Sequence, residues 1–235
     1  MEKFIRDFRV GDFPLVSGML TDRDYLKTEK DVMAAVDLIE LRVDMFSAVD
    51  SAHVKNIFKR VRDLFNKPII ATIRDVKEGG EKEVPNRLDL YRGIIPLSDV
   101  VDVEINADDL FPEIRKLCTT FRKLLIGSFH NFDLTPEPAV LEGIVSKAVS
   151  SKADIAKIAV KAKTQKDLLD LFVFALNNRD KRLITIAMGE RGLASRIFMP
   201  VIGSPISYGY INVPSAPGQF SVVEMMAIFR KLKLR

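Results

Sequence analysis

Short apolar runs alternate with amphipathic stretches along the whole chain. The runs have the composition of buried strands, while the stretches between them carry apolar residues at three- and four-residue spacing, as helices do when they pack on one face. Eight strand–helix pairs are predicted, with strands over 14–20, 37–44, 68–74, 100–106, 123–132, 154–160, 182–189 and 208–213, and helices over 29–36, 51–65, 86–97, 108–121, 135–151, 164–178, 193–202 and 221–233.

Eight such pairs in 235 residues predict a (β/α)8 barrel, the TIM-barrel fold, as a single domain over residues 1–235. The connections are short, and no Gly/Ser-rich linker divides the chain. The remaining segment 4–13 is expected to form a short hairpin that closes the bottom of the barrel. An open doubly wound sheet is the competing fold, but it often carries a glycine-rich phosphate loop after its first strand, and the SGMLTD segment at 17–22 is no such loop.

Composition narrows the class of protein. No apolar stretch is long enough to span a membrane, and the charged N-terminus has no apolar signal core. The net charge of +4 is modest, and the basic residues are spread out, which disfavours nucleic-acid binding. A single cysteine, Cys118, excludes an internal disulfide and fits a reducing compartment, so a cytoplasmic protein is expected; Cys118 itself is expected to serve packing.

Strand alternation predicts an unusually polar barrel interior. Because neighbouring side chains on a strand point to opposite faces, the apolar face must meet the helices and the other face must point inward. The inward residues are then Glu40, Arg42, Thr72, Arg74, Asp102, Glu104, Ser128, His130 and Lys157. Barrel interiors are usually filled by branched apolar side chains, and buried charges cost several kcal/mol unless they pair or bind a ligand. A self-satisfied network of ion pairs explains part of this set, but it explains a histidine and a lysine on adjacent strands less well.

Lys157 carries the most specific chemistry, because it lies in the middle of the apolar run 154–160. Burial lowers the pKa of a lysine ammonium, and a neutral lysine can form an imine with a ketone or aldehyde. The alternative is a lysine at a strand end whose head reaches solvent. His130, near the end of its strand, suits a general acid/base, whereas His53 is expected on the surface. Paired His or Cys spacing for a metal is absent; a magnesium ion held by Asp102 and Glu104 stays an alternative.

Several segments, in order and spacing, resemble the type I 3-dehydroquinate dehydratases, the Schiff-base enzymes of the shikimate pathway. The resemblance covers nearly the whole chain and rests on ELR at 40–42, ATIRDVKEGG at 71–80, DVEI at 102–105, LIGSFHN at 125–131, DIAKIAV at 154–160, MGERGLASR at 188–196 and PSAPGQ at 214–219. Phe129 departs mildly from the family pattern, in which the residue before the histidine is often polar or tyrosine.

The resemblance implies a role for each matching position. Lys157 would form the imine with the substrate ketone, His130 would be the general acid/base, and Glu78 would pair with His130. The implied substrate-binding residues, with Arg196 on the substrate carboxylate, are Ser17, Glu40, Arg42, Arg74, Met188, Arg196, Ser215 and Gln219. The segment 207–220 would form a lid.

The implied reaction converts 3-dehydroquinate to 3-dehydroshikimate by syn elimination of water, the third step of the shikimate pathway, without cofactor or metal. A homodimer is implied as well. Two alternatives stay open at this point: another lysine-imine barrel enzyme, such as an aldolase or transaldolase, and a non-catalytic barrel that binds an anionic metabolite. The carboxylate-binding arginine and the SAPGQ segment favour the dehydratase, and the intact lysine, histidine and glutamate argue against a mere binder.

Overall fold

The computed structural model describes residues 2–214 and 219–235, and its strands form two sheets. A small antiparallel sheet pairs β1 with β2, and a large parallel sheet has the order β10-β3-β4-β5-β6-β7-β8-β9. The strand bounds are β1 (Phe4–Ile5), β2 (Phe8–Arg9), β3 (Leu15–Leu20), β4 (Leu38–Arg42), β5 (Ile69–Thr72), β6 (Val100–Glu104), β7 (Leu124–Asn131), β8 (Ile155–Lys161), β9 (Leu183–Met188) and β10 (Ile206–Tyr210).

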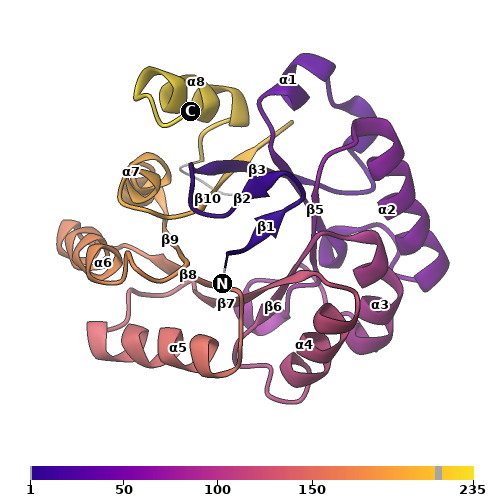
Figure 1. The fold of residues 1–235 in the computed structure, drawn as a ribbon, viewed down its shortest axis with the longest axis horizontal. Coiled ribbons are helices and arrows are strands. Elements are labelled where there is room, and N and C mark those ends of the chain that lie inside the picture. Colours follow the sequence, from indigo (N-terminus) through magenta and orange to yellow (C-terminus); the bar gives the residue numbers. More distant parts are fainter. Residues whose placement is uncertain (1, 215–218) are drawn as a thin grey trace.

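The helices surround the parallel strands (Figure 1). Their bounds are α1 (Lys30–Ala34), α2 (Ser51–Phe65), α3 (Arg87–Ile94), α4 (Phe111–Thr120), α5 (Pro138–Ser150), α6 (Gln165–Asn177), α7 (Ser195–Val201) and α8 (Val222–Lys231). Short 3-10 turns also occur after strands, including η3 (Val76–Glu78) after β5 and η5 (Glu190–Gly192) after β9. Each barrel strand is therefore followed by a helix, and the predicted (β/α)8 barrel is confirmed. The barrel is nearly closed, since β10 pairs with β3 whereas no ladder pairs β9 with β10 within the described residues.

Two apolar layers stabilise the barrel. The larger lies between strands and helices and includes the fully buried Phe58, Tyr91 and Phe229. The smaller lies inside the barrel and contains side chains from the strands, such as Leu15 and Ile70, and from the β1–β2 hairpin. Burial of such side chains contributes about 1.5–3 kcal/mol each.

The β1–β2 hairpin covers the amino-terminal end of the barrel, as expected from the sequence. Ile5 is buried in the inner apolar layer. The Arg6 guanidinium donates hydrogen bonds to the Asn66 and Lys67 carbonyl oxygens, which precede β5. Figure 1 shows the hairpin lying across the middle of the ring of strands. This hairpin leaves the opposite, carboxyl-terminal end of the strands for a site.

Some predicted details differ from the structure. The last strand covers Ile206–Tyr210 instead of 208–213, and the helix predicted over 86–97 ends at Ile94, two residues before Pro96. The expectation of a solvated His53 is only partly right, because Nε2 of this half-buried side chain lies 2.8 Å from Asp22 Oδ2.

Cys118 is buried, as expected, and burial raises the pKa of its thiol to about 12. Within the described ranges, none of the helices has the length and apolar character required to cross a bilayer.

Candidate active site

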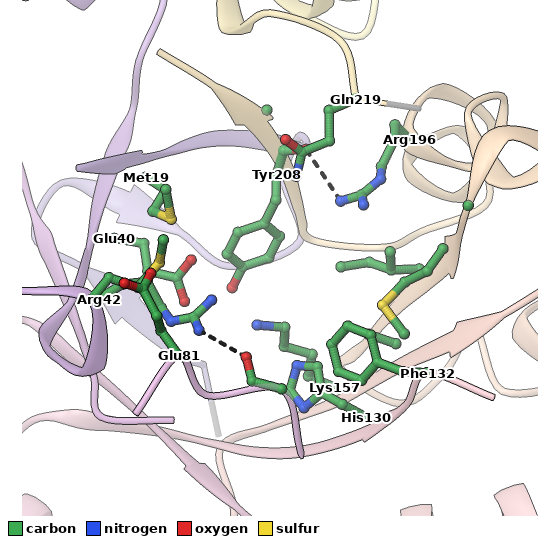
Figure 2. Close-up of a pocket in the computed structure, with 17 residues that line it drawn as sticks. Met19, Glu40, Arg42, Glu81, His130, Phe132, Lys157, Arg196, Tyr208 and Gln219 are labelled. Atoms are coloured by element: carbon green, nitrogen blue, oxygen red, sulfur yellow. Dashed lines mark hydrogen bonds between the residues drawn. The ribbon is translucent and has the colours of Figure 1, made fainter. Parts of the chain in front are cut away.

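A cavity of about 330 Å³ opens at the carboxyl-terminal ends of the strands, the end at which barrel enzymes carry their sites. Polar side chains from β4, β7, β8, α7 and the loops converge on it, alongside three methionines (Figure 2). Its volume suits a small metabolite. The cavity is lined by Met19, Glu40, Arg42, Met45, Gly79, Glu81, His130, Phe132, Lys157, Ala159, Ile186, Met188, Gly189, Arg196, Tyr208, Gly209 and Gln219.

Lys157 extends from β8 into the cavity with only 5% of its surface exposed, so its head does not reach bulk solvent. Its Nζ donates a hydrogen bond to Asp102 Oδ2 at 2.9 Å. The same Nζ lies 4.3 Å from the centroid of the Tyr208 ring, close enough for a cation–π contact. The ammonium is therefore held by one carboxylate and one aromatic face at the wall of a cavity, which makes the nitrogen accessible to a ligand there.

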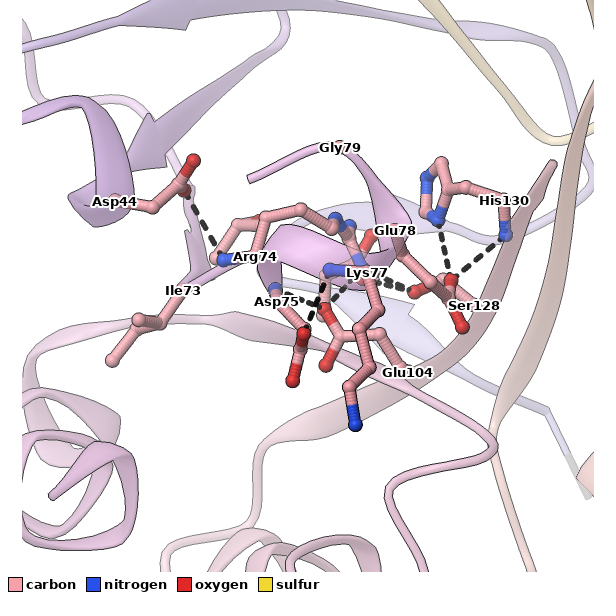
Figure 3. A network of polar contacts seen from close by, with 12 residues as sticks. Asp44, Ile73, Arg74, Asp75, Lys77, Glu78, Gly79, Glu104, Ser128 and His130 are labelled. Carbon is pink, nitrogen blue, oxygen red and sulfur yellow. Dashed lines mark hydrogen bonds and ion pairs between the residues drawn. The ribbon is translucent and has the colours of Figure 1, made fainter. Parts of the chain in front are cut away.

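Arg74 follows β5 and connects polar residues of two strands, β6 and β7 (Figure 3). Its guanidinium donates to Glu104 Oε1 at 2.9 Å, to Ser128 Oγ at 2.8 Å and to Asp102 Oδ1 at 2.7 Å. Glu104 also pairs with Arg87. These contacts match the ion-pair network considered from the sequence. Arg74 itself does not line the cavity, so its implied contact with a substrate hydroxyl stays a prediction.

The Asp102 carboxylate forms ion pairs with both Arg74 and Lys157. Its carboxylate accepts from Arg74 and Ser128 on one oxygen and from Lys157 on the other. Burial alone raises the pKa of a carboxyl group, but the charges of Arg74 and Lys157 outweigh it and hold the pKa of Asp102 well below its usual range. Asp102 is therefore an anion throughout the neutral range and anchors the Lys157 head. Arg74 and Lys157 already pair with both oxygens of Asp102, a carboxylate that the alternative magnesium site would need as a ligand.

Glu78 reaches His130 from the loop after β5. Glu78 Oε2 accepts a hydrogen bond from the His130 backbone N–H at 2.8 Å and lies 3.0 Å from His130 Nδ1. The backbone contact fixes the carboxyl group against β7, and the second contact fixes the imidazole plane. Phe132 stacks beside the ring, with centroids 6.5 Å apart. Because Nδ1 is engaged by Glu78, the other ring nitrogen, Nε2, is left for a ligand in the cavity.

Burial acts on both members of this pair. It raises the pKa of Glu78 to about 7, with Arg74 opposing the shift and Glu104 adding to it. Burial, together with the nearby charges of Arg74 and Lys157, lowers the pKa of His130 well below its usual value. The imidazole is therefore neutral at physiological pH, the form in which it can accept a proton.

Arg196 projects from the start of α7 into the opposite side of the cavity. Its guanidinium donates to the Tyr208 carbonyl oxygen at 3.2 Å, while its buried Nε has no hydrogen-bond partner among the described residues. Within residues 2–214 and 219–235, no carboxylate forms an ion pair with it. Burial lowers the pKa of Arg196 to about 10, so the group stays cationic at neutral pH. A buried guanidinium without an anionic partner is suited to a ligand carboxylate.

The other implied site residues divide into two groups. Glu40, Arg42, Met188 and Gln219 line the cavity, with Arg42 held in a two-bond pairing to Asp44 at 2.9 and 2.8 Å. Ser17 does not line the cavity: it is fully buried one step down β3, and Met19, on the same strand face, takes the position at the wall. A contact between Ser17 and a substrate therefore stays a prediction, and Ser215 lies outside the described residues.

Several cavity residues were not singled out from the sequence. Glu81 lies in a loop, where strand alternation gives no information about direction. Phe132 directly follows β7, and alternation over the predicted strand 123–132 places it on the face of Ser128 and His130. Tyr208 lies on β10, whose predicted start at 208 was two residues late. Strand alternation was the available signal, because Tyr208 is two residues after Ile206 and therefore shares its inward face.

Fold and site together define a class. The protein is a (β/α)8 barrel with a buried lysine and a glutamate-held histidine facing one cavity at the carboxyl ends of the strands. Comparison with protein families narrows this class, because the model of the type I 3-dehydroquinase family matches residues 18–234. The chain belongs to the type I 3-dehydroquinase family.

Similar proteins support this membership. The chain is 38% identical over 224 residues to the 3-dehydroquinate dehydratase of Thermodesulfovibrio yellowstonii, covering 95% of this chain and 98% of that protein. A crystal structure of the Aquifex aeolicus 3-dehydroquinate dehydratase has a TM-score of 0.86 at 33% identity, over 92% of this chain and 98% of that one. The type I enzyme of Clostridium difficile, determined with covalently modified comenic acid, has a TM-score of 0.90 at 26% identity, over 99% of this chain and 98% of that one.

Proposed function

We propose that this protein dehydrates 3-dehydroquinate to 3-dehydroshikimate through an imine on Lys157. The observation that carries the proposal is the meeting of three groups at one cavity: the Lys157 amine, the Glu78-held imidazole of His130, and the guanidinium of Arg196, which has no carboxylate partner among the described residues. An electrophile-forming amine, a base and a carboxylate clamp are the groups that this reaction needs. Family membership and relatives named 3-dehydroquinate dehydratase support the same assignment.

Substrate binding begins at Arg196. Its planar fork matches the substrate carboxylate in a two-bond arrangement that lysine cannot copy. Glu40 and Arg42, which also line the cavity, would bind the ring hydroxyls. Held by these groups, the substrate presents its ketone to Lys157 Nζ.

Imine formation follows. Lys157 Nζ, after giving up a proton, attacks the ketone carbon, and the resulting carbinolamine loses water to form the protonated imine. Neutral His130 is the base at the cavity wall for these proton transfers. The protonated imine keeps the positive charge on Nζ, so the contact with Asp102 at 2.9 Å stabilises it as it stabilised the ammonium.

Elimination uses that charge. The proton on C2, next to the imine carbon, is weakly acidic in the ketone, and the cationic imine provides an electron sink for the pair left behind. His130 Nε2 takes this proton and gives an enamine. The same nitrogen then donates to the departing C1 hydroxyl, which leaves as water on the same face. Water finally hydrolyses the conjugated imine and frees the product and Lys157.

The most direct test of the activity is optical. Purified protein mixed with 3-dehydroquinate should produce the ultraviolet absorbance of the conjugated enone, with no added metal or cofactor. Aldol cleavage, the activity of the other lysine-imine alternative, would instead release smaller carbonyl products. Fragments without enone would therefore contradict the dehydratase and support an aldolase.

We further propose a cellular setting. The product belongs to the shikimate pathway, so the protein would act as its third step in aromatic amino acid biosynthesis. A cytoplasmic location fits the single, buried Cys118. A homodimer is proposed from family membership, and light scattering on the purified protein tests it.

A further inference from the structure

Tyr208 contributes a hydroxyl group to the cavity that the proposed mechanism has not yet used. The residue lies on β10, with 7% of its surface exposed, and lines the cavity. Figure 2 shows its ring between Arg196 and Lys157, with the hydroxyl directed toward the space beside Glu40. The side chain therefore stands between the group proposed for the substrate carboxylate and the group proposed for its ketone.

The Tyr208 hydroxyl has no hydrogen-bond partner among the described residues, although it is buried. In two other buried tyrosines of this protein, Tyr91 and Tyr25, the hydroxyl does have a hydrogen-bond partner. The Tyr91 hydroxyl donates to the Asp102 carbonyl oxygen at 2.8 Å, and the Tyr25 hydroxyl accepts from Arg60 at 3.2 Å. An unpaired buried hydroxyl is unfavourable, so one that faces a cavity indicates a partner in the ligand.

The charges around Tyr208 keep its hydroxyl protonated. Burial raises the pKa of the phenol well above its usual value, and the carboxylates of Glu40 and Asp102 add to the rise. The group therefore has a proton to donate at any pH at which the site works. Glu40, on the wall that the hydroxyl faces, can only accept when ionised. A ligand hydroxyl between the two can accept from Tyr208 and donate to Glu40.

Lys157 identifies which ligand hydroxyl this is. Because Nζ lies 4.3 Å over the Tyr208 ring, a carbon bonded to Nζ lies beside that ring. In 3-dehydroquinate the imine carbon, C3, is flanked by the C2 methylene and by C4, which carries a hydroxyl. Only C4 places an oxygen next to the imine carbon.

We infer that Tyr208 is a substrate-binding and specificity-determining residue whose hydroxyl donates a hydrogen bond to the C4 hydroxyl of the imine-bound substrate. This inference rests on the proposed function, since it takes 3-dehydroquinate as the ligand. Because the Nζ–C3 bond of an imine is a double bond, the substrate ring has two arrangements about it, and the contact favours one of them. It thereby turns the C2 methylene toward His130, the proposed base.

The test compares Tyr208→Phe with wild type on two substrates, 3-dehydroquinate and its 4-deoxy analogue. On 3-dehydroquinate, Tyr208→Phe should lower kcat/KM roughly ten- to a hundredfold, because a buried hydrogen bond is lost. On the 4-deoxy analogue, both proteins should have the same kcat/KM, since the partner hydroxyl is missing. The melting temperature of Tyr208→Phe should be equal to or above that of wild type, because the substitution removes a buried hydroxyl that has no described protein partner.

Tyr25→Phe provides the matched control, since it removes a buried hydroxyl away from the cavity lining. It should leave both kcat/KM values unchanged. Full activity of Tyr208→Phe on 3-dehydroquinate would overturn the inference, and so would equal losses on the two substrates. Wild-type turnover in the same assay tests the proposed function separately: an inactive wild type overturns that function, whereas an active wild type with an equally active Tyr208→Phe overturns only the role of Tyr208.

Discussion

At the scale of single residues, the balance of charge around Asp102 accounts for the state of the site. Arg74 neutralises this carboxylate from below and Lys157 from the cavity side. Removing one partner of such a buried pair leaves an uncompensated charge, at a cost of about 3–5 kcal/mol. Since the protonated imine of Lys157 is also a cation, this balance is restored once the imine has formed.

Glu78 gives a prediction about pH at the same scale. The pKa of its carboxyl in the folded protein is raised from 4.5 to about 7, so its contribution to stability is fully present below pH 4.5 and is lost as the pH rises through 7. Glu78→Gln removes this titration. Relative to the variant, wild type should lose about 3 kcal/mol of unfolding free energy between pH 4.5 and pH 8. Urea unfolding at both pH values measures the difference, and an offset independent of pH would contradict a raised pKa.

Residue identities at the site could be predicted where strands carry them. Alternation along β4 to β8 placed Glu40, Arg42, His130 and Lys157 inward, and all four line the cavity. The same rule could not separate the depth of one inward residue from the next. Ser17 and Arg74 are inward as well, but they lie below the cavity wall, because depth depends on strand stagger, which alternation does not encode.

At the scale of elements, the connection from β9 to α7 determines where Arg196 stands. Ser195 Oγ donates to the Gly192 carbonyl oxygen at 2.6 Å and accepts from the Ala187 N–H at 3.1 Å, which ties α7 and η5 to the end of β9. Gly192 packs so closely on this strand that a Cβ there would lie 2.2 Å from the Ala187 carbonyl oxygen. The position of the proposed carboxylate clamp thus depends on a glycine.

Gly192→Ala should therefore displace η5 and the start of α7. We expect a loss of about 1–3 kcal/mol of unfolding free energy from the forced backbone shift. KM for 3-dehydroquinate should rise about tenfold, equivalent to about 1.4 kcal/mol of lost binding. Steady-state kinetics and thermal melting test both effects.

Gly143→Ala is the matched control, because a Cβ at this helical position in α5 meets nothing within 4 Å. It should leave KM unchanged and stabilise the protein by about 0.5–1 kcal/mol. An unchanged KM in Gly192→Ala would show that Arg196 does not depend on this contact.

The order of elements could be predicted from the sequence, but the loops could not. Hydrophobic periodicity gave eight strand–helix pairs because each element must bury one face. Glu78 shows the difference: its segment looks like a solvated, charged loop, yet the structure turns it through η3 onto His130. Only the family resemblance identified Glu78, because the contact joins residues far apart in the chain.

At the scale of the whole molecule, stability and chemistry are placed at opposite ends of the barrel. The hairpin lies at the amino-terminal end and the cavity at the carboxyl-terminal end, and the inner apolar layer extends from the hairpin to Ala159, Ile186 and Tyr208 on the cavity wall. Substitutions in the hairpin should therefore change stability and leave catalysis alone.

Ile5→Ala tests this separation, since Ile5 is buried in the inner layer. It should destabilise the protein by about 2–4 kcal/mol through the cavity it leaves, with kcat and KM unchanged at a temperature where the variant is folded. Phe4→Ala, at a neighbouring position with 52% exposure, should change stability by less than about 0.5 kcal/mol. A fall in kcat for folded Ile5→Ala would show that the two ends are coupled.

The central claim is that Lys157 forms an imine with the substrate, and borohydride trapping tests it most directly. Wild type incubated with 3-dehydroquinate and sodium borohydride should lose activity and gain one covalent adduct, located on Lys157 by peptide mass spectrometry. His130→Ala should give the same adduct yet turn over very slowly, whereas Lys157→Met should give none. An unmodified Lys157 in wild type that keeps full activity under these conditions would contradict the claim.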